Sequence, residues 1–148
     1  MIYFLFALCI FGLDLFIKKQ IEAQDESIFP IRLEGGFVLE KHHNHGFVLN
    51  RFDQHPKLVR IVSCLTFFPV FFWALWLFSK KTGELGRLGA ACLIGGAASN
   101  FWDRIFRGYV VDYLRLPVKK IRNIIFNIAD FFIFLGGAIC AIYEIFSK

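Results

Sequence analysis

With 148 residues, of which 57% are hydrophobic and 20% charged, the chain is too short for two domains and too apolar for an ordinary soluble protein. Its long uncharged runs predict an all-α membrane protein formed by a single domain over residues 1–148. The net charge of +5 suits contact with anionic lipid headgroups and gives no reason to expect a nucleic-acid partner.

The first predicted membrane span covers residues 1–17. It is interrupted by Asp14, and Lys18 follows one turn later, where side chains four residues apart on a helix can meet. Asp14 would lie about 20 Å along the helix, in the far third of a hydrocarbon core about 30 Å thick. Two interpretations remain open, a pair that serves a functional site or an ion pair at the membrane interface.

A polar segment over residues 19–57 separates the first two spans. Partial alternation around Gly35 and Gly36 predicts a short β-ribbon with a turn at the two glycines. At roughly forty residues the segment is too long for a simple connection, so we expect a small extramembrane β-platform between the first and second helices.

Three histidines, His42, His43 and His45, fall within this segment and invite a metal interpretation. No carboxylate or cysteine completes a ligand set at suitable spacing, so we predict that the protein holds no metal. Asn44 and Gly46, among the same residues, are typical of a turn.

The second predicted span, residues 58–78, ends in a stretch of eighteen residues without a charge, which is long enough to cross a bilayer. The following loop, residues 79–87, carries three basic residues and one acid, and the positive-inside rule places it in the cytoplasm. The stretch after the third span is also basic, so this signal is not clean.

The third predicted span covers residues 88–106 and has one side made of small residues, which let helices approach closely. Asn100 lies about 18 Å along this span, with Asp103 and Arg104 about one turn further. Residues 107–123 are predicted to be a loop that contains Asp112.

The fourth predicted span covers residues 124–146. Asn127 and Asp130 are three residues apart and share one helix face, with Asp130 about 9 Å from the start of the span.

Four spans with short connections give an up-and-down bundle with both termini on one side of the membrane. This topology brings the costly polar residues to the opposite side, namely Asp14, Lys18, Asn44, Asn100, Asp103, Arg104, Asp112, Asn127 and Asp130. Ionisable groups beside apolar spans indicate a functional site.

Asp112 and Asp130 are the two acids that we expect to face each other. Two close carboxyl groups cannot both ionise cheaply, so they would share one proton. Such a pair activates water for attack on a carbonyl group, because one Asp takes a proton from water and the other polarises the carbonyl oxygen. A proton or cation relay is the rival interpretation.

Five motifs, in this order, resemble those of lipoprotein signal peptidase (signal peptidase II), the intramembrane aspartyl protease family of bacteria. They are Asp14-x-x-x-Lys18, Asn44-x-Gly46, GGAASNFWDR (95–104), GYVVDY (108–113) and FNIADFFIFLG (126–136). Together they span nearly the whole chain, and the last three in combination are highly specific.

The resemblance implies that Asp112 and Asp130 are the catalytic pair. It implies that further residues support the pair and the substrate, namely Asn100, Asp103, Arg104 and Asn127, while Asp14 and Lys18 brace the first helix. Asn44, with Gly46, would sit on the platform that covers the cleft.

The resemblance also implies the reaction and its location. The substrate would be a prolipoprotein whose cysteine carries diacylglycerol, cut just before that cysteine without metal or cofactor. The protein would be a monomer among membrane lipids in the bacterial cytoplasmic membrane, with its active site toward the outer face and both termini in the cytoplasm.

One segment departs from the family pattern. After Asn-x-Gly the family usually has small residues and then an aromatic residue, whereas this chain has Phe47-Val48-Leu49-Asn50. The bulk of Phe47 and Val48 is expected to narrow the cleft or to change which substrates fit.

Two other functions compete with the peptidase. A membrane protein that binds lipidated peptides without cutting them would not need both Asp112 and Asp130. A proton-coupled carrier would spread its acids across the membrane depth, whereas these acids are predicted at one level.

Overall fold

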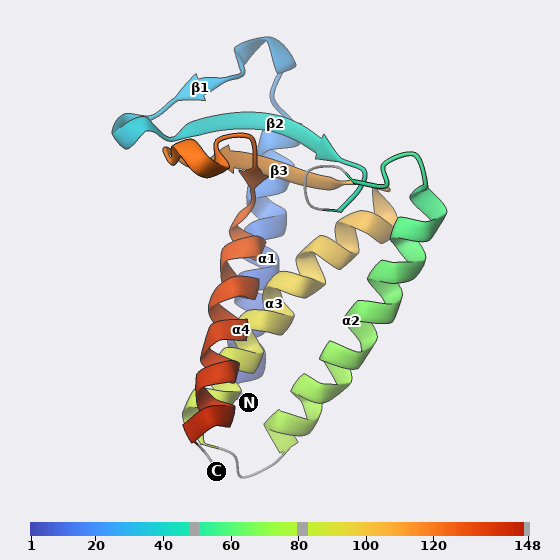
Figure 1. Cartoon of the computed structure of the whole chain (residues 1–148), viewed down its shortest axis with the longest axis vertical. Coiled ribbons are helices and arrows are strands. Elements are labelled where there is room, and N and C mark those ends of the chain that lie inside the picture. The colour runs from blue at the N-terminus through green and yellow to red at the C-terminus, as the bar shows by residue number, and fades with distance from the viewer. Residues whose placement is uncertain (48–50, 80–82, 147–148) are drawn as a thin grey trace.

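The computed structural model describes residues 1–47, 51–79 and 83–146. Helices in this part run side by side below a small antiparallel sheet, with the N-terminus and the end of the last helix at the far end from the sheet (Figure 1). The helices are α1 (Ile2–Glu22), α2 (Pro56–Ser79), α3 (Glu84–Phe106) and α4 (Ile128–Phe146).

Helix α3 is the centre of the bundle and packs against each of the other three helices. A Cβ added at Gly95 would lie 2.7 Å from the carbonyl oxygen of Ala7 in α1. A Cβ added at Gly96 would collide with the carbonyl oxygen of Ala129 in α4. The side of small residues is therefore a packing seam, as the sequence predicted.

Helices α2 and α4 are long and apolar enough to cross a membrane, and they are the two described helices that meet this test. Most of their side chains are not buried inside the protein. Large apolar groups outside the cavity lining, such as Phe72 in α2 and Ile145 in α4, are exposed. Such surfaces are typical of contact with lipid.

The sheet corrects two predictions: that the platform comes only from the segment between α1 and α2, and that residues 107–123 form a loop. Only half of the sheet comes from the segment between α1 and α2. The other half comes from the connection between α3 and α4, which was predicted to be a loop. The strands, in their order across the sheet, are β1 (Ile31–Arg32), β2 (Val38–Asn44), β3 (Val110–Arg115) and β4 (Ile125–Phe126). The predicted turn at Gly35 and Gly36 is confirmed, since both have positive φ angles, 74° and 80°.

Helix ends also differ from the predicted spans. Helix α1 continues to Glu22, and α3 begins at Glu84 rather than residue 88. Helix α4 begins at Ile128 rather than residue 124, because the residues before it pair with β3. The predicted basic loop 79–87 overlaps both α2 and α3, and residues 80–82 lie outside the described part of the chain.

Candidate active site

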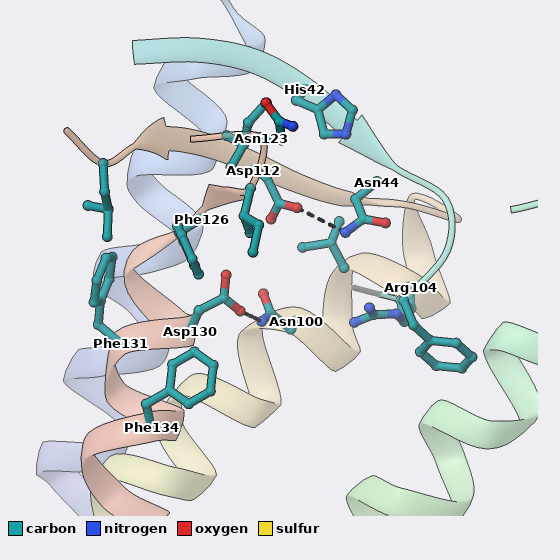
Figure 2. Close-up of a pocket in the computed structure, with 15 residues that line it drawn as sticks. His42, Asn44, Asn100, Arg104, Asp112, Asn123, Phe126, Asp130, Phe131 and Phe134 are labelled. Atoms are coloured by element: carbon teal, nitrogen blue, oxygen red, sulfur yellow. Dashed lines mark hydrogen bonds between the residues drawn. The ribbon is translucent and has the colours of Figure 1, made fainter. Parts of the chain in front are cut away.

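A cavity of about 600 Å³ lies between the sheet and the adjoining ends of α3 and α4 (Figure 2). Asp112 from β3 and Asp130 from α4 both line it. Its other polar lining residues are His42, Asn44, Asn100, Arg104 and Asn123, and its apolar lining includes Phe47, Phe126, Phe131 and Phe134. The topology therefore brings both predicted catalytic acids to one cavity.

Asp112 points into the cavity because side chains alternate along β3. Its neighbours Val111 and Tyr113 face the other way, into a buried apolar cluster. The Nδ2 of Asn44 donates a hydrogen bond to Oδ2 of Asp112 at 3.0 Å, and the Nδ2 of Asn127 donates to Oδ1 at 2.7 Å. Both oxygens of the carboxyl group are thus held by carboxamides.

Asp130 lies in the first turn of α4 and is held by the start of that helix. The backbone N–H of Asn127 donates to Oδ2 of Asp130 at 3.0 Å, and the N–H of Asp130 donates to Oδ1 of Asn127, also at 3.0 Å. These reciprocal bonds satisfy backbone donors that a helix N-terminus leaves free. The same capping arrangement therefore begins the helix and orients the carboxyl group.

Two carboxamides connect the acids. Asn127 donates to Oδ1 of Asn100 at 3.1 Å. Asn100 donates from Nδ2 to Oδ1 of Asp130 at 2.8 Å (Figure 2). Oδ1 of Asn100 also accepts a bond from Nζ of Lys18 at 2.8 Å. An ammonium group only donates, so Lys18 fixes the carboxamide of Asn100 with its NH₂ toward Asp130.

Lys18 is completely buried between two acids. Its Nζ lies 2.7 Å from Oδ2 of Asp14 and 3.0 Å from Oδ2 of Asp103, and all three side chains have 0% exposure. The interpretation of Asp14 and Lys18 as a pair that snorkels toward solvent is therefore wrong, because neither side chain is exposed. A buried charge requires such compensation, which the network supplies.

Asp14 joins four elements through this network. Its Oδ2 accepts from the hydroxyl of Ser99 at 2.6 Å, and its Oδ1 accepts from the hydroxyl of Tyr113 at 3.1 Å and from the N–H of Ala129 at 3.3 Å. Helix α1 is thereby tied to α3, β3 and α4 just behind the two cavity acids.

Sequence reasoning did not select Ser99 or Tyr113 as site residues. Ser99 precedes Asn100 and was counted only among the small residues of the seam. Tyr113 follows Asp112, and strand alternation would have placed its hydroxyl on the opposite face had β3 been predicted.

Asp103 and Gly108 attach the end of α3 to β3. Oδ2 of Asp103 accepts from the N–H of Val111 at 3.2 Å, and its Oδ1 lies 2.9 Å from Nη1 of Arg107. Gly108 takes a φ of 85°, which glycine adopts without the strain of a Cβ, and its N–H donates to the carbonyl of Asp103.

Arg104 and the Asn44–Gly46 turn close another side of the cavity. The N–H of Gly46 donates to Oδ1 of Asn44 at 3.1 Å, which confirms the predicted turn. Nη2 of Arg104 donates to the carbonyl of Gly46 at 3.3 Å. Its Nε is buried without a hydrogen-bond partner among the described residues. Arg104 also lines the cavity, so its guanidinium can offer a donor to a bound molecule.

Phe47, from the segment that departs from the family pattern, lines the cavity. Its ring lies 6.0 Å from the guanidinium of Arg104. Phe47 is therefore in a position to affect the cavity, and its effect on cleft width or substrate choice stays a prediction. Val48, Leu49 and Asn50 lie outside the described residues.

The three histidines point in different directions. His42 lines the cavity, whereas the rings of His43 and His45 contact the ring of Tyr109. No group of three or more histidine, cysteine or acidic side chains is arranged to hold a metal ion within the described ranges. That the protein works without metal or cofactor stays a prediction.

The electrostatic environment of Asp112 suits acid–base chemistry. Burial, and then the neighbouring charge of Asp130, raise the pKa of Asp112 to about 7. The hydrogen bonds from Asn44 and Asn127 oppose this change because they favour the ionised form. Near neutral pH the carboxyl group can therefore both accept and release a proton.

Comparisons with known proteins agree with the motifs. A family model described as Signal peptidase (SPase) II matches residues 6–146. A lipoprotein signal peptidase from Clostridioides difficile (strain 630) is 32% identical over 148 residues, covering 99% of this chain and 96% of the relative. One from Wigglesworthia glossinidia brevipalpis is 30% identical over 132 residues, with coverages of 89% and 86%.

Solved structures share the fold. A bacterial membrane enzyme structure obtained by the in meso method at 2.3 Å resolution matches with a TM-score of 0.81 and 20% identity, covering 97% of this chain and 87% of that chain. A second such structure, at 1.9 Å resolution, matches with a TM-score of 0.80 and 20% identity, covering 99% of this chain and 94% of that chain.

Proposed function

Because the chain belongs to the signal peptidase II family of lipoprotein-processing membrane proteases, we propose that Asp112 and Asp130 are its catalytic pair. The substrate is a diacylglyceryl-modified prolipoprotein, cut just before the modified cysteine. The observation that carries the proposal is that both carboxyl groups line one cavity and are connected through Asn127 and Asn100.

The pair acts as general base and general acid. The ionised carboxylate takes a proton from water, whose oxygen attacks the peptide carbonyl, while the protonated carboxyl group donates to the carbonyl oxygen. When the tetrahedral intermediate collapses, the carbon–nitrogen bond breaks, and the amine of the cysteine leaves with the proton that the general base took from water. The general acid regains its proton from the hydroxyl group of the intermediate as the new carboxyl group forms. The raised pKa of Asp112 supports this mechanism, because it keeps a shared proton available near neutral pH.

The remaining predicted site residues position this pair and the substrate. Asn44, Asn100 and Asn127 hold the carboxyl groups, and the guanidinium of Arg104, which lines the cavity, donates to a substrate carbonyl. Lys18 with Asp14 and Asp103 fixes the helices behind the pair.

The apolar half of the cavity suits the rest of the substrate. Phe126, Phe131 and Phe134 line it on the side of α4. A signal peptide and two acyl chains are largely apolar, and their burial against such side chains is favourable.

All four helices cross the membrane in this proposal. They contain 21, 24, 23 and 19 residues, or about 28 to 36 Å at 1.5 Å per residue. The charges of α1 that would oppose insertion, Asp14 and Lys18, are buried against other helices and do not face lipid. The protein acts as a monomer in the bacterial cytoplasmic membrane, with the sheet and cavity on the outer side and both termini in the cytoplasm.

The proposal is tested by mixing purified protein with a diacylglyceryl-modified prolipoprotein and following the shift to mature size on a gel. Wild type is expected to produce the shift, and Asp112→Asn and Asp130→Asn are each expected to lose cleavage while remaining folded. Asp53→Asn, an exposed aspartate outside the cavity lining, is the matched control and should cut normally.

Substantial turnover by either cavity variant would contradict the proposed mechanism. Binding of the lipidated substrate without cleavage by folded wild type would favour the second candidate, a binder of lipidated peptides. The observation that favours this second candidate function is that the bulky Phe47 lines the cavity.

A further inference from the structure

Two polar side chains in the cavity, His42 and Asn123, are not used by the proposed mechanism. Both line the same cavity as Asp112 and Asp130. Within the described part of the chain, neither side chain makes a hydrogen bond to the protein, in contrast to Asn44, Asn100 and both acids. Polar groups in a largely apolar pocket usually fix the orientation of a ligand.

The register of β2 and β3 places His42 beside the catalytic pair. His42 is the direct cross-strand partner of Asp112, and the register shifts between Leu39 and His42. Without that irregularity His42 would oppose Val111, whose side chain faces away from the cavity. Alternation then sends His43 to the far face, where its Nε2 lies 2.6 Å from Oε1 of Glu22.

Asn123 reaches the same edge of the cavity from the connection that leads into β4. Figure 2 shows Asn123 and His42 both on the platform side of Asp112, while Asp130 and Phe134 lie on the opposite side, toward the helices. His42 and Asn123 therefore lie on the side of the proposed catalytic pair that is farther from the helices.

Both groups have the hydrogen-bonding capacity that suits a peptide backbone. Burial lowers the pKa of His42, against the opposing charge of Glu40, so the imidazole is neutral at pH 7. A neutral imidazole and a carboxamide each offer a donor and an acceptor. The N–H and C=O groups of an extended peptide need one of each.

We propose that His42 and Asn123 bind the main chain of the residues that directly follow the lipid-modified cysteine. The inference rests on the proposed function, because it takes the cut bond to lie between Asp112 and Asp130. The apolar signal peptide comes from the side of the helices, so the residues beyond the cut bond extend toward the platform. There they pass the two polar groups.

The experiment compares two diacylglyceryl-modified peptides with the same signal sequence. The short one ends at the modified cysteine as an amide, and the long one continues with four alanines, so that only main-chain groups are added. Wild type is expected to show about ten-fold higher kcat/KM on the long peptide, mainly through KM, since two hydrogen bonds contribute about this much. In the His42→Ala, Asn123→Ala double variant the long-to-short ratio should fall to about one.

Two further variants sharpen the comparison. His42→Gln keeps a donor and an acceptor and should retain most of the ratio. His43→Ala alters the neighbouring histidine on the other face of β2 and should keep the wild-type ratio. Because each ratio is measured within one variant, a general loss of folded protein does not change it.

A double variant with the wild-type ratio, or a wild type without preference for the long peptide, would overturn the inference. If folded wild type cut neither peptide, the proposed function itself would fail, and the inference with it.

Discussion

At the scale of single residues, the environment of Asp112 links catalysis to stability. The folded protein raises the pKa of Asp112 to about 7, whereas an unfolded chain leaves it near 4. Between these values the folded state binds more protons than the unfolded state. The contribution of Asp112 to stability is therefore fully present below pH about 4 and is lost as pH rises through 7.

Asp112→Asn should remove this dependence, because the carboxamide does not titrate. The melting temperature of the variant minus that of wild type, measured in detergent, should increase as pH rises from 4 to 8. A difference that stays constant with pH would show that Asp112 titrates in the folded protein as it does in the unfolded chain.

Lys18→Ala should strongly destabilise the protein. Lys18 compensates Asp14 and Asp103, and all three side chains are completely buried, so the change leaves buried carboxylates without their cation. Removing one partner of a buried pair costs about 3–5 kcal/mol. Unfolding in detergent measures the loss.

Lys19→Ala is the matched control, because Lys19 is the next residue on α1 and is exposed. It should change stability by less than about 0.5 kcal/mol. Equal stability of the Lys18 and Lys19 variants would mean that the buried network has another means of charge compensation.

At the scale of elements, the contact of α3 with α4 depends on glycines that have no room for a side chain. A Cβ at Gly136 would lie 2.6 Å from the carbonyl oxygen of Gly89, whereas a Cβ at Gly137 would meet nothing within 4 Å. Of these two neighbouring glycines, only Gly136 packs closely against α3.

Gly136→Ala should therefore cost about 1–3 kcal/mol by overpacking, and it should also reduce cleavage because α4 carries Asp130. Gly137→Ala should be neutral or slightly stabilising, since alanine favours the helix. Thermal unfolding and cleavage of the two variants, measured together, check the pair. Similar behaviour of both variants would contradict the packing argument.

At the scale of the whole molecule, the proposed orientation makes opposite ends of the bundle accessible from opposite sides of the membrane. Ser27 lies on the exposed platform, and Glu84 lies at the exposed start of α3. In a chain with its four cysteines replaced, Ser27→Cys should react with a membrane-impermeant thiol reagent in intact cells. Glu84→Cys should react only after the cells are permeabilised, and the reverse pattern would overturn the orientation.

Most of the helical arrangement could be predicted from the sequence, because hydrophobic length and small-residue patterns are local properties. The sheet was predicted only in part. The stretch Val110–Arg115 has the β-branched and aromatic residues of a strand, but its partner β2 is more than sixty residues away. The hydrogen bonds between β2 and β3 join segments far apart in the sequence, so the residues around β3 do not indicate this pairing.

The sequence by itself selected the residues that we propose for the chemistry. Polar groups beside apolar spans raise the free energy of membrane insertion, so they are candidates for a functional role. The residues selected in this way include Asp14, Lys18, Asn100, Asp112 and Asp130. Their proximity followed from an up-and-down chain, and the structure brings them together.

Only the tertiary structure decided how these groups are held. The capping bonds of Asn127, the orientation of Asn100 by Lys18 and the placement of His42 opposite Asp112 depend on contacts between distant segments. The physical reason is that hydrogen bonds and strand register depend on distances of a few tenths of an ångström between elements. Hydrophobic patterning fixes which elements form, but not those distances.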